Sequence, residues 1–182
     1  MLRTLTCLGL LPALILASRT GVRADSPAPV TLEQYEEFSR IHHGYWKGTV
    51  SSTIGEEEIT RETRKEAVYL DFVYEEDRKL TTTTGYGPRG HGSAITFYDP
   101  ARKVIRSTGL AIGGALTEHT MTRRDDHWYR ESTQTTLDGK QRKFRSTIRF
   151  SNQNNTITIV IDLVDGDRVI SSQTNVWNRV EQ

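Results

Sequence analysis

The stretch Gly44-Tyr45-Trp46-Lys47-Gly48 decides the fold that we expect for this chain. A short helical pattern runs into it, and short strands separated by turns follow it. A large aromatic side chain between two glycines suits a strand that begins at the closed end of a small β-barrel. The indole fills the floor, and the glycines let neighbouring backbone pass close by. The stretch therefore predicts an architecture, but it names no reaction.

The residues before this stretch predict one short helix that lies across one end of the barrel. Thr31 has the side chain of an N-cap, and Gln34 is placed as its capping-box partner. Gly44 ends the helical pattern. An apolar stripe at a spacing of three runs between them, made of Leu32, Tyr35, Phe38 and Ile41.

After Trp46 the apolar residues alternate with period two, which is typical of β-strands. Residues 66–74 put one set of side chains on a single face, namely Val68, Leu70, Phe72 and Tyr74. Asp138-Gly139 and Asp165-Gly166 predict hairpin turns. Further strands are expected over 93–98, 103–110, 116–123, 127–137, 141–150, 156–164 and 168–180.

This order of elements predicts an all-β fold, a single antiparallel up-and-down barrel with one short N-terminal helix. About nine or ten short strands joined by local turns close most simply on themselves, because closure removes exposed sheet edges. A β-sandwich is the alternative. The sequence shows no repeat and no low-complexity linker, so we expect residues 31–182 to form one domain.

The first two dozen residues resemble a signal peptide. Arg3 precedes an apolar run over 5–17, and Val22-Arg23-Ala24 offers small residues at a cleavage site. We expect residues 1–24 to be removed after Ala24, residues 25–30 to form a disordered leader, and the protein to be secreted or periplasmic. An uncleaved N-terminal anchor is the alternative, and no later run is long enough to span a membrane.

Cleavage at that point changes the charge and removes Cys7, the only cysteine. The whole chain has 24 basic and 23 acidic residues, and loss of three arginines and no acid leaves 21 against 23. A basic domain that binds nucleic acid is therefore not expected, although Lys143, Arg145 and Arg149 share one strand face. Disulfides and thiol chemistry are not expected either.

A helix followed by Gly44-x-Trp46-x-Gly48 and an all-β meander resembles the calycin architecture of lipocalins. It is also similar to nitrobindin-type haem barrels and to a bacterial lipocalin-like family of unknown function. Phe97-Tyr98-Asp99-Pro100, with the aliphatic strand after it, is most similar to that last family. The resemblance implies a lumen that holds a small, mainly apolar molecule. Nitrobindin-type barrels bind haem through a C-terminal histidine, whereas the last histidine here is His127, so we expect no haem and no other cofactor.

The glycine-rich segment 81–92 is the expected mobile loop at the open mouth of the barrel. Gly85-Tyr86-Gly87-Pro88-Arg89-Gly90 matches the dinucleotide fingerprint in letters, but Pro88 removes an amide and a strand rather than a helix follows. A connector without function is the alternative to a binding loop. Arg89 and His91 are its polar side chains.

The other motifs of catalysis or metal binding are weak. His42 and His43 are adjacent, so their side chains diverge, and His119 and His127 flank a predicted hairpin across which they could face each other. No spacing typical of a metal site and no G-x-S-x-G motif occurs, so neither a metal nor a catalytic residue is assigned. The acidic clusters lie in predicted turns, where carboxylates are normally solvated.

Only 35% of the residues are hydrophobic, which is little for a solid apolar interior and favours a lumen lined in part by hydroxyls. The hydroxyl residues in weakly alternating strands are Ser107, Thr117, Thr133, Thr135, Ser172 and Thr174.

Three hypotheses for function follow. The first is a barrel, monomeric or homodimeric, that binds an apolar or amphipathic small molecule without catalysis. Its expected ligand-binding residues are Trp46, Phe72, Tyr74, Arg89 and His91. The second is a hydrolase- or isomerase-like enzyme in which His91 or His119 acts as general base. The third is a solid structural or interaction barrel of the cell envelope.

Overall fold

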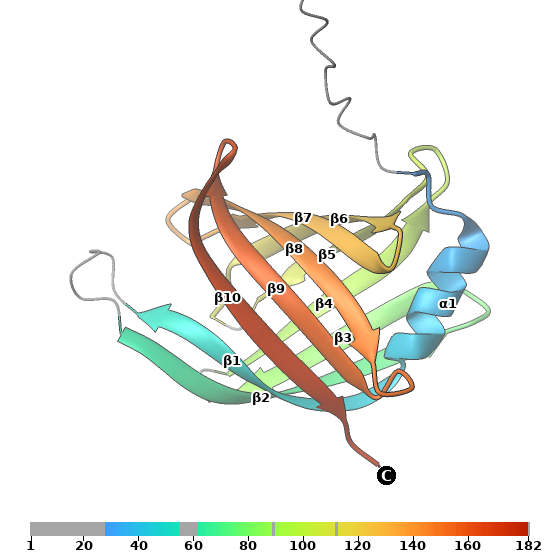
Figure 1. The fold of residues 1–182 in the computed structure, drawn as a ribbon, viewed down its shortest axis with the longest axis horizontal. Helices are drawn as coiled ribbons and strands as arrows, with labels where there is room; N and C mark the ends of the chain where they lie inside the picture. The colour runs from blue at the N-terminus through green and yellow to red at the C-terminus, as the bar shows by residue number, and fades with distance from the viewer. Residues whose placement is uncertain (1–27, 55–61, 89, 112, 182) are drawn as a thin grey trace, which may run out of the picture.

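The computed structural model describes residues 28–54, 62–88, 90–111 and 113–181. In these described segments, ten antiparallel strands form one closed barrel, and a single α-helix lies over one of its ends (Figure 1). The helix is α1 (Leu32–His42), and the strands are β1 (Gly44–Ile54), β2 (Glu62–Glu75), β3 (Leu80–Gly87), β4 (Gly90–Asp99), β5 (Val104–Leu110), β6 (Leu116–Arg124), β7 (His127–Thr135), β8 (Gln141–Ser151), β9 (Thr156–Asp165) and β10 (Arg168–Arg179).

Each strand pairs with its neighbours in the chain, and β1 pairs with both β2 and β10, which closes the barrel. The expected all-β barrel with one short N-terminal helix is thereby confirmed. The expected hairpin turns at Gly139 and Gly166 are also present, and both glycines have positive φ angles of 82° and 59°. The strands expected from alternation begin and end within four residues of their expected bounds.

Helix α1 begins at the expected capping box. The Thr31 Oγ1 accepts from the Gln34 amide at 3.2 Å, and the Gln34 side chain accepts from the Thr31 amide at 3.0 Å. The apolar stripe differs from the expectation, because a spacing of three drifts around a helix of 3.6 residues per turn. Leu32 is exposed, and the helix instead buries Tyr35, Phe38, Ser39 and His42.

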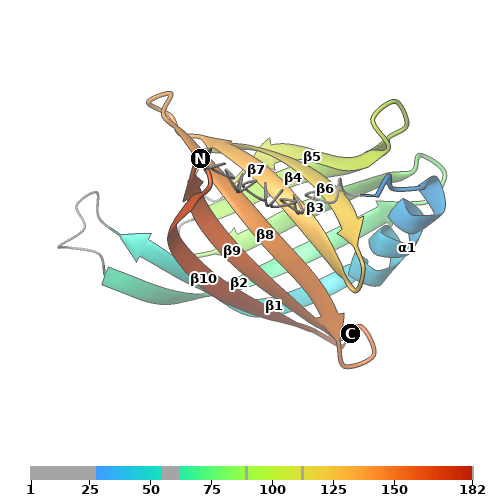
Figure 2. The same ribbon diagram turned by 45° about the horizontal axis from the view of Figure 1, so that its top comes forward.

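Contacts with the β2–β3 turn and with the last residue of β10 fix α1 over the end where β1 begins and β10 finishes (Figure 2). The Tyr35 hydroxyl donates to the carbonyl of Lys79, in the β2–β3 turn, at 2.9 Å. The Arg179 guanidinium donates to the carbonyls of Ile41 and His43, which are among the last carbonyls of the helix. We call this end of the barrel the helix end.

The stretch Gly44–Gly48 joins the helix to the barrel through close packing. Gly44 has a φ of 111°, and a Cβ on Gly48 would lie 2.3 Å from the Trp177 ring. The Trp46 side chain is fully buried, and its Nε1 donates to the His42 carbonyl at 2.7 Å. Arg179 lies over the Trp46 ring, 4.3 Å from its centroid.

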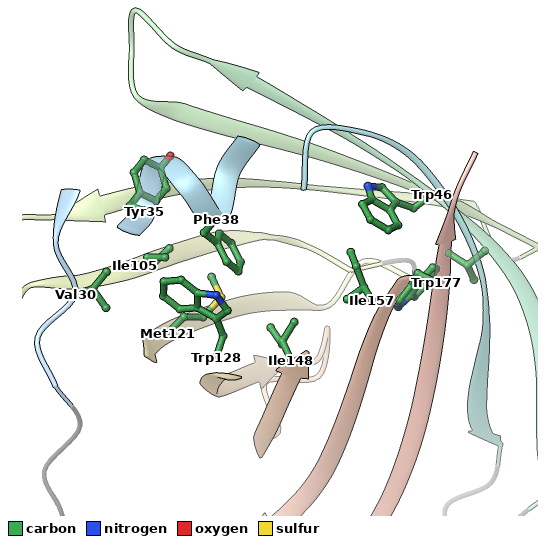
Figure 3. Close-up of a cluster of buried hydrophobic side chains, with 11 residues drawn as sticks. Val30, Tyr35, Phe38, Trp46, Ile105, Met121, Trp128, Ile148, Ile157 and Trp177 are labelled. Carbon is green, nitrogen blue, oxygen red and sulfur yellow. The ribbon is translucent and has the colours of Figure 1, made fainter. Parts of the chain in front are cut away.

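The buried apolar side chains gather between the helix and the floor of the barrel. Figure 3 shows Phe38 on α1 directed toward Met121 and Trp128 on the barrel wall. The Phe38 and Trp128 rings meet edge to face with centroids 4.8 Å apart. The packed core therefore occupies the helix end and not the whole interior.

Residues 28–30 lie against the barrel. Val30 is 1% exposed, its amide donates to the Lys103 carbonyl at 2.8 Å, and its carbonyl accepts from the Tyr98 hydroxyl. Ala28 forms a β-bridge with Arg123. This part of the expected leader over 25–30 thus packs onto the barrel, because Val30 buries its side chain there. The expected signal peptide over 1–24 and residues 25–27 lie outside the described residues.

The segment 81–92 is not the long loop that was expected. It forms the paired ends of β3 and β4, in register from Leu80 with Phe97 to Gly87 with Gly90. The four consecutive threonines at 81–84 explain the difference, because β-branched residues favour strands. The tip of this hairpin lies at the barrel end opposite α1, as expected for the mouth.

Candidate ligand-binding cavity

The barrel encloses a cavity of about 460 Å³, within the usual range for small-molecule sites. All ten strands and α1 contribute to its wall, from Phe38 and His42 at the helix end to Gly87, Pro88 and Ala111 near the opposite end. A smaller cavity of about 210 Å³ adjoins it. The two share the side chains of His119, Arg130, Gln134, Ile161 and Gln173.

Two further depressions, of about 520 and 780 Å³, are larger but involve mainly the outer wall. Charged residues line them, including Glu118, Glu131 and Lys143 in one and Lys47 and Lys65 in the other. These residues alternate along their strands with residues that line the cavity or pack into the core. Neither groove offers an enclosed apolar surface, so the interior cavity is the candidate site.

Strand pairing sorts the cavity wall into rows at different depths. The row nearer the helix end joins Trp128, Ile148, Ile159 and Asn175 across β7, β8, β9 and β10, and is mostly apolar. The next row joins Arg130, Ser146, Ile161 and Gln173 across the same strands, and is mostly polar. His119 pairs with Ser132 one step further from the helix. The site is therefore apolar at its floor and polar above it.

The apolar floor also includes side chains from the opposite part of the barrel. Phe72 on β2 lies against His42 of the helix, with ring centroids 5.1 Å apart. Met121 and Trp177 complete the floor. The Trp177 Nε1 is buried and has no hydrogen-bond partner among the described residues.

Arg130 supplies a positive charge to this interior. Its Nε is buried without a partner among the described residues, and its Nη2 donates to Ser146 Oγ at 3.3 Å. Burial lowers the pKa of Arg130 to about 10, so the guanidinium stays protonated at pH 7. Part of its surface remains accessible because the side chain lines a cavity instead of packing into the core.

Two histidines line the same cavity in the neutral form. Burial lowers the pKa of His42 to about 4, and its Nδ1 lies 2.8 Å from the Phe38 carbonyl oxygen. Burial, together with the positive charge of Arg130, lowers the pKa of His119 to about 3. The His119 Nδ1 lies 2.7 Å from Ser132 Oγ. Arg130 thus stands beside a neutral hydrogen-bonding ring.

Of the five residues expected to bind a ligand, Phe72 lines the cavity. Trp46 is buried at the helix end behind the floor, and Tyr74 packs edge to face against Tyr35 with centroids 6.3 Å apart. His91 is exposed on β4, and Arg89 lies outside the described residues. The four of these residues that the structure describes do not form one cluster.

The expected pairing of His119 with His127 does not occur. His119 pairs with Ser132 and faces the cavity, whereas His127 pairs with Arg124 and contacts Asp126. The expected hydroxyl lining occurs in part: Ser107 lines the main cavity and Thr117 the smaller one. Thr133 and Thr174 instead line the outer grooves.

Sequence reasoning missed the polar side chains on β7 and β10 that line the cavity, which are Arg130, Gln134, Gln173 and Asn175. The alternation of residues along β7 could have indicated that Arg130 and Gln134 face the interior. Trp128 is a natural inward residue, and every second residue after it, from Arg130 to Gln134, faces the same side. The polarity of this strand concealed the signal.

Neither a protein-family model nor a curated protein sequence matches this chain. Among the described residues, no helix is both long and apolar enough to cross a membrane. In the same part of the chain, no three His, Cys, Asp or Glu side chains are grouped as ligands for a metal ion.

Proposed function

We propose that this protein binds a small molecule inside the barrel and performs no chemistry on it. The observation that supports this proposal is the cavity of about 460 Å³, which has an apolar floor below a polar row. An amphipathic molecule fits such a gradient, because its apolar part leaves water while its polar part keeps hydrogen-bond partners. A solid structural barrel offers no reason for an interior of this kind.

The geometry favours binding over catalysis. His119 is the expected candidate base that lies in the cavity, and its pKa of about 3 makes it a weak base at neutral pH. Its Nδ1 contact is the Ser132 hydroxyl, which does not orient a base as a carboxylate does. His91, the other candidate, is exposed on the outer end of β4.

The resemblance to lipocalin-like barrels and the signal-peptide pattern of residues 1–24 extend the proposal. They support a protein that is exported and carries or captures its ligand outside the cytoplasm. Cleavage after Ala24 is checked by N-terminal sequencing of the secreted chain.

Probe binding tests the proposed function. A fluorescent apolar probe should bind the purified protein at one site, and Thr83→Trp should abolish binding because residue 83 lines the cavity. Thr82→Trp is the matched control, since residue 82 is adjacent to residue 83 and its side chain points to the outer face of β3. Equal binding by both variants, with unchanged circular dichroism, would place the probe outside the barrel. Absence of any bound molecule by native mass spectrometry, together with no probe binding, would rule the proposal out.

A further inference from the structure

We infer that the ligand is an amphipathic organic anion whose carboxylate is bound by Arg130. This inference rests on the proposed function and adds the chemical class of the ligand. Three observations carry it: the unpartnered guanidinium nitrogen, the polar side chains in register beside it, and the apolar floor beneath them.

The first observation is that Arg130 lacks a counter-charge. Among the described residues no carboxylate oxygen lies within the 4.0 Å of an ion pair with its guanidinium, and its Nε has no hydrogen-bond partner. The carboxylate among the cavity-lining residues is Glu66, on β2. In the strand order β2 is five steps from β7 in either direction around the barrel, so Glu66 and Arg130 stand on opposite walls.

A protonated guanidinium without a counter-charge is costly inside a protein, because burial removes its hydration. Such groups are normally paired or placed where a ligand completes them. Arg130 is also charged at pH 7, since its pKa stays near 10. An anion that enters the cavity would therefore gain an attraction that is screened less than in bulk water.

The second observation concerns the shape of the polar row. A guanidinium presents a planar fork of donors that matches two carboxylate oxygens. Ser146 and Gln173 share the row of Arg130, and Gln134 lies four residues further along β7 on the same face. These hydroxyl and amide groups supply further hydrogen bonds to the oxygens of a bound head group.

The third observation is the apolar floor next to Arg130. Ile148 and Ile159 lie in the row directly beneath Arg130. Met121 on β6 is paired with Arg130 in the β6–β7 register. An alkyl or aryl group joined to the carboxylate would lie on these side chains. The arrangement selects a molecule with one negative end and one apolar end, which neither a free phosphate nor a neutral lipid provides.

The test compares two probes of equal length, decanoate and decanol, by isothermal titration with the full chain. Decanoate should bind about tenfold or more tightly than decanol, and Arg130→Gln should remove that preference while decanol binding is kept. Arg149→Gln, an exposed arginine on the outer face of β8, is the control and should change neither affinity. Arg130→Lys keeps the charge without the fork and should retain part of the preference.

The outcomes separate this inference from the proposed function. Equal binding of both probes, unchanged in Arg130→Gln, would overturn the role of Arg130 and leave the binding barrel intact. No binding of either probe to the wild type, with no molecule retained after purification, would rule out both the role of Arg130 and the proposed binding function. A thermal melt of each variant shows that the barrel is folded, so that loss of binding is not loss of structure.

Discussion

The Trp46 indole Nε1 donates a hydrogen bond of 2.7 Å to the main-chain carbonyl of His42, the last residue of the helix. This bond spans the turn between α1 and β1 and satisfies one of the carbonyls that a helix leaves free at its C-terminus. It ties the position of the helix to the first strand of the barrel.

Replacing Trp46 by Phe should therefore destabilise the protein by about 2 kcal/mol, because a buried acceptor loses its donor and the smaller ring leaves space. Trp177→Phe is a matched control. That indole is also buried, but its Nε1 has no partner among the described residues, so the same change should cost less. Chemical denaturation of the ligand-free variants measures both values, and equal losses would argue against the role of the bond.

Arg179 should be the second residue that holds the C-terminus of α1 against the barrel. Arg179→Gln removes donors to the carbonyls of Ile41 and His43 and the contact over the Trp46 ring. We expect a loss of about 2 kcal/mol in the free energy of unfolding. Arg168→Gln, in an exposed ion pair at the other end of β10, should have almost no effect. A loss as large at Arg168 would show that the charge of β10, and not its contacts with the helix, determines stability.

Removal of the unpaired charge of Arg130 should stabilise the ligand-free barrel. Arg130→Met replaces a desolvated guanidinium by an apolar chain of similar length, and we expect a gain of about 1 kcal/mol. The measurement is the thermal midpoint without ligand, with Arg149→Met as the surface control. If Arg130 were a structural residue, the same change would lower the midpoint instead.

Acid should destabilise the protein through His42 and His119, the two histidines that line the cavity. Their folded pKa values, about 4 for His42 and about 3 for His119, lie below the ordinary value of 6.5. The unfolded chain therefore binds protons first as the pH falls. The stabilisation is complete above about pH 6.5 and is lost progressively from there down to the folded pKa values.

The free energy of unfolding should fall with decreasing pH by up to about 1.4 kcal/mol per pH unit for each histidine. Denaturation curves between pH 7 and pH 4.5 measure it, and His119→Gln should reduce the slope by about half. His91→Gln, at an exposed position on β4, serves as the control. A slope that is the same in all three proteins would assign the acid sensitivity to other groups.

Local signals were sufficient for the helix and for most of the strands, but not for β3. The Thr31–Gln34 capping box and the Asp-Gly turns depend on residues a few positions apart, and the alternation around Phe72 depends on a single strand. The segment 81–92 was misread because its glycines suggested a loop, whereas threonines on β3 and the pairing with β4 held it as a hairpin.

The site could not be predicted in the same way, because its rows run across strands. Arg130, Ser146 and Gln173 are 16 and 27 residues apart, and only the registers of β7 to β10 bring them together. Trp46 and Tyr74 were predicted to contact the ligand because they are aromatic residues in strands that were expected to face inward. These side chains are inward, as expected, but they pack at the helix end instead of facing the cavity.

Both described ends of the chain leave the barrel on the side that the helix covers. Val30 is held by Lys103 in the β4–β5 turn, and β10 finishes at Arg179 beside the helix (Figure 1). The hairpin tips at the opposite rim carry neither end. A surface or a fused reporter joined next to Val30 or Arg179 would therefore lie on the helix side, away from the hairpin tips of the opposite rim.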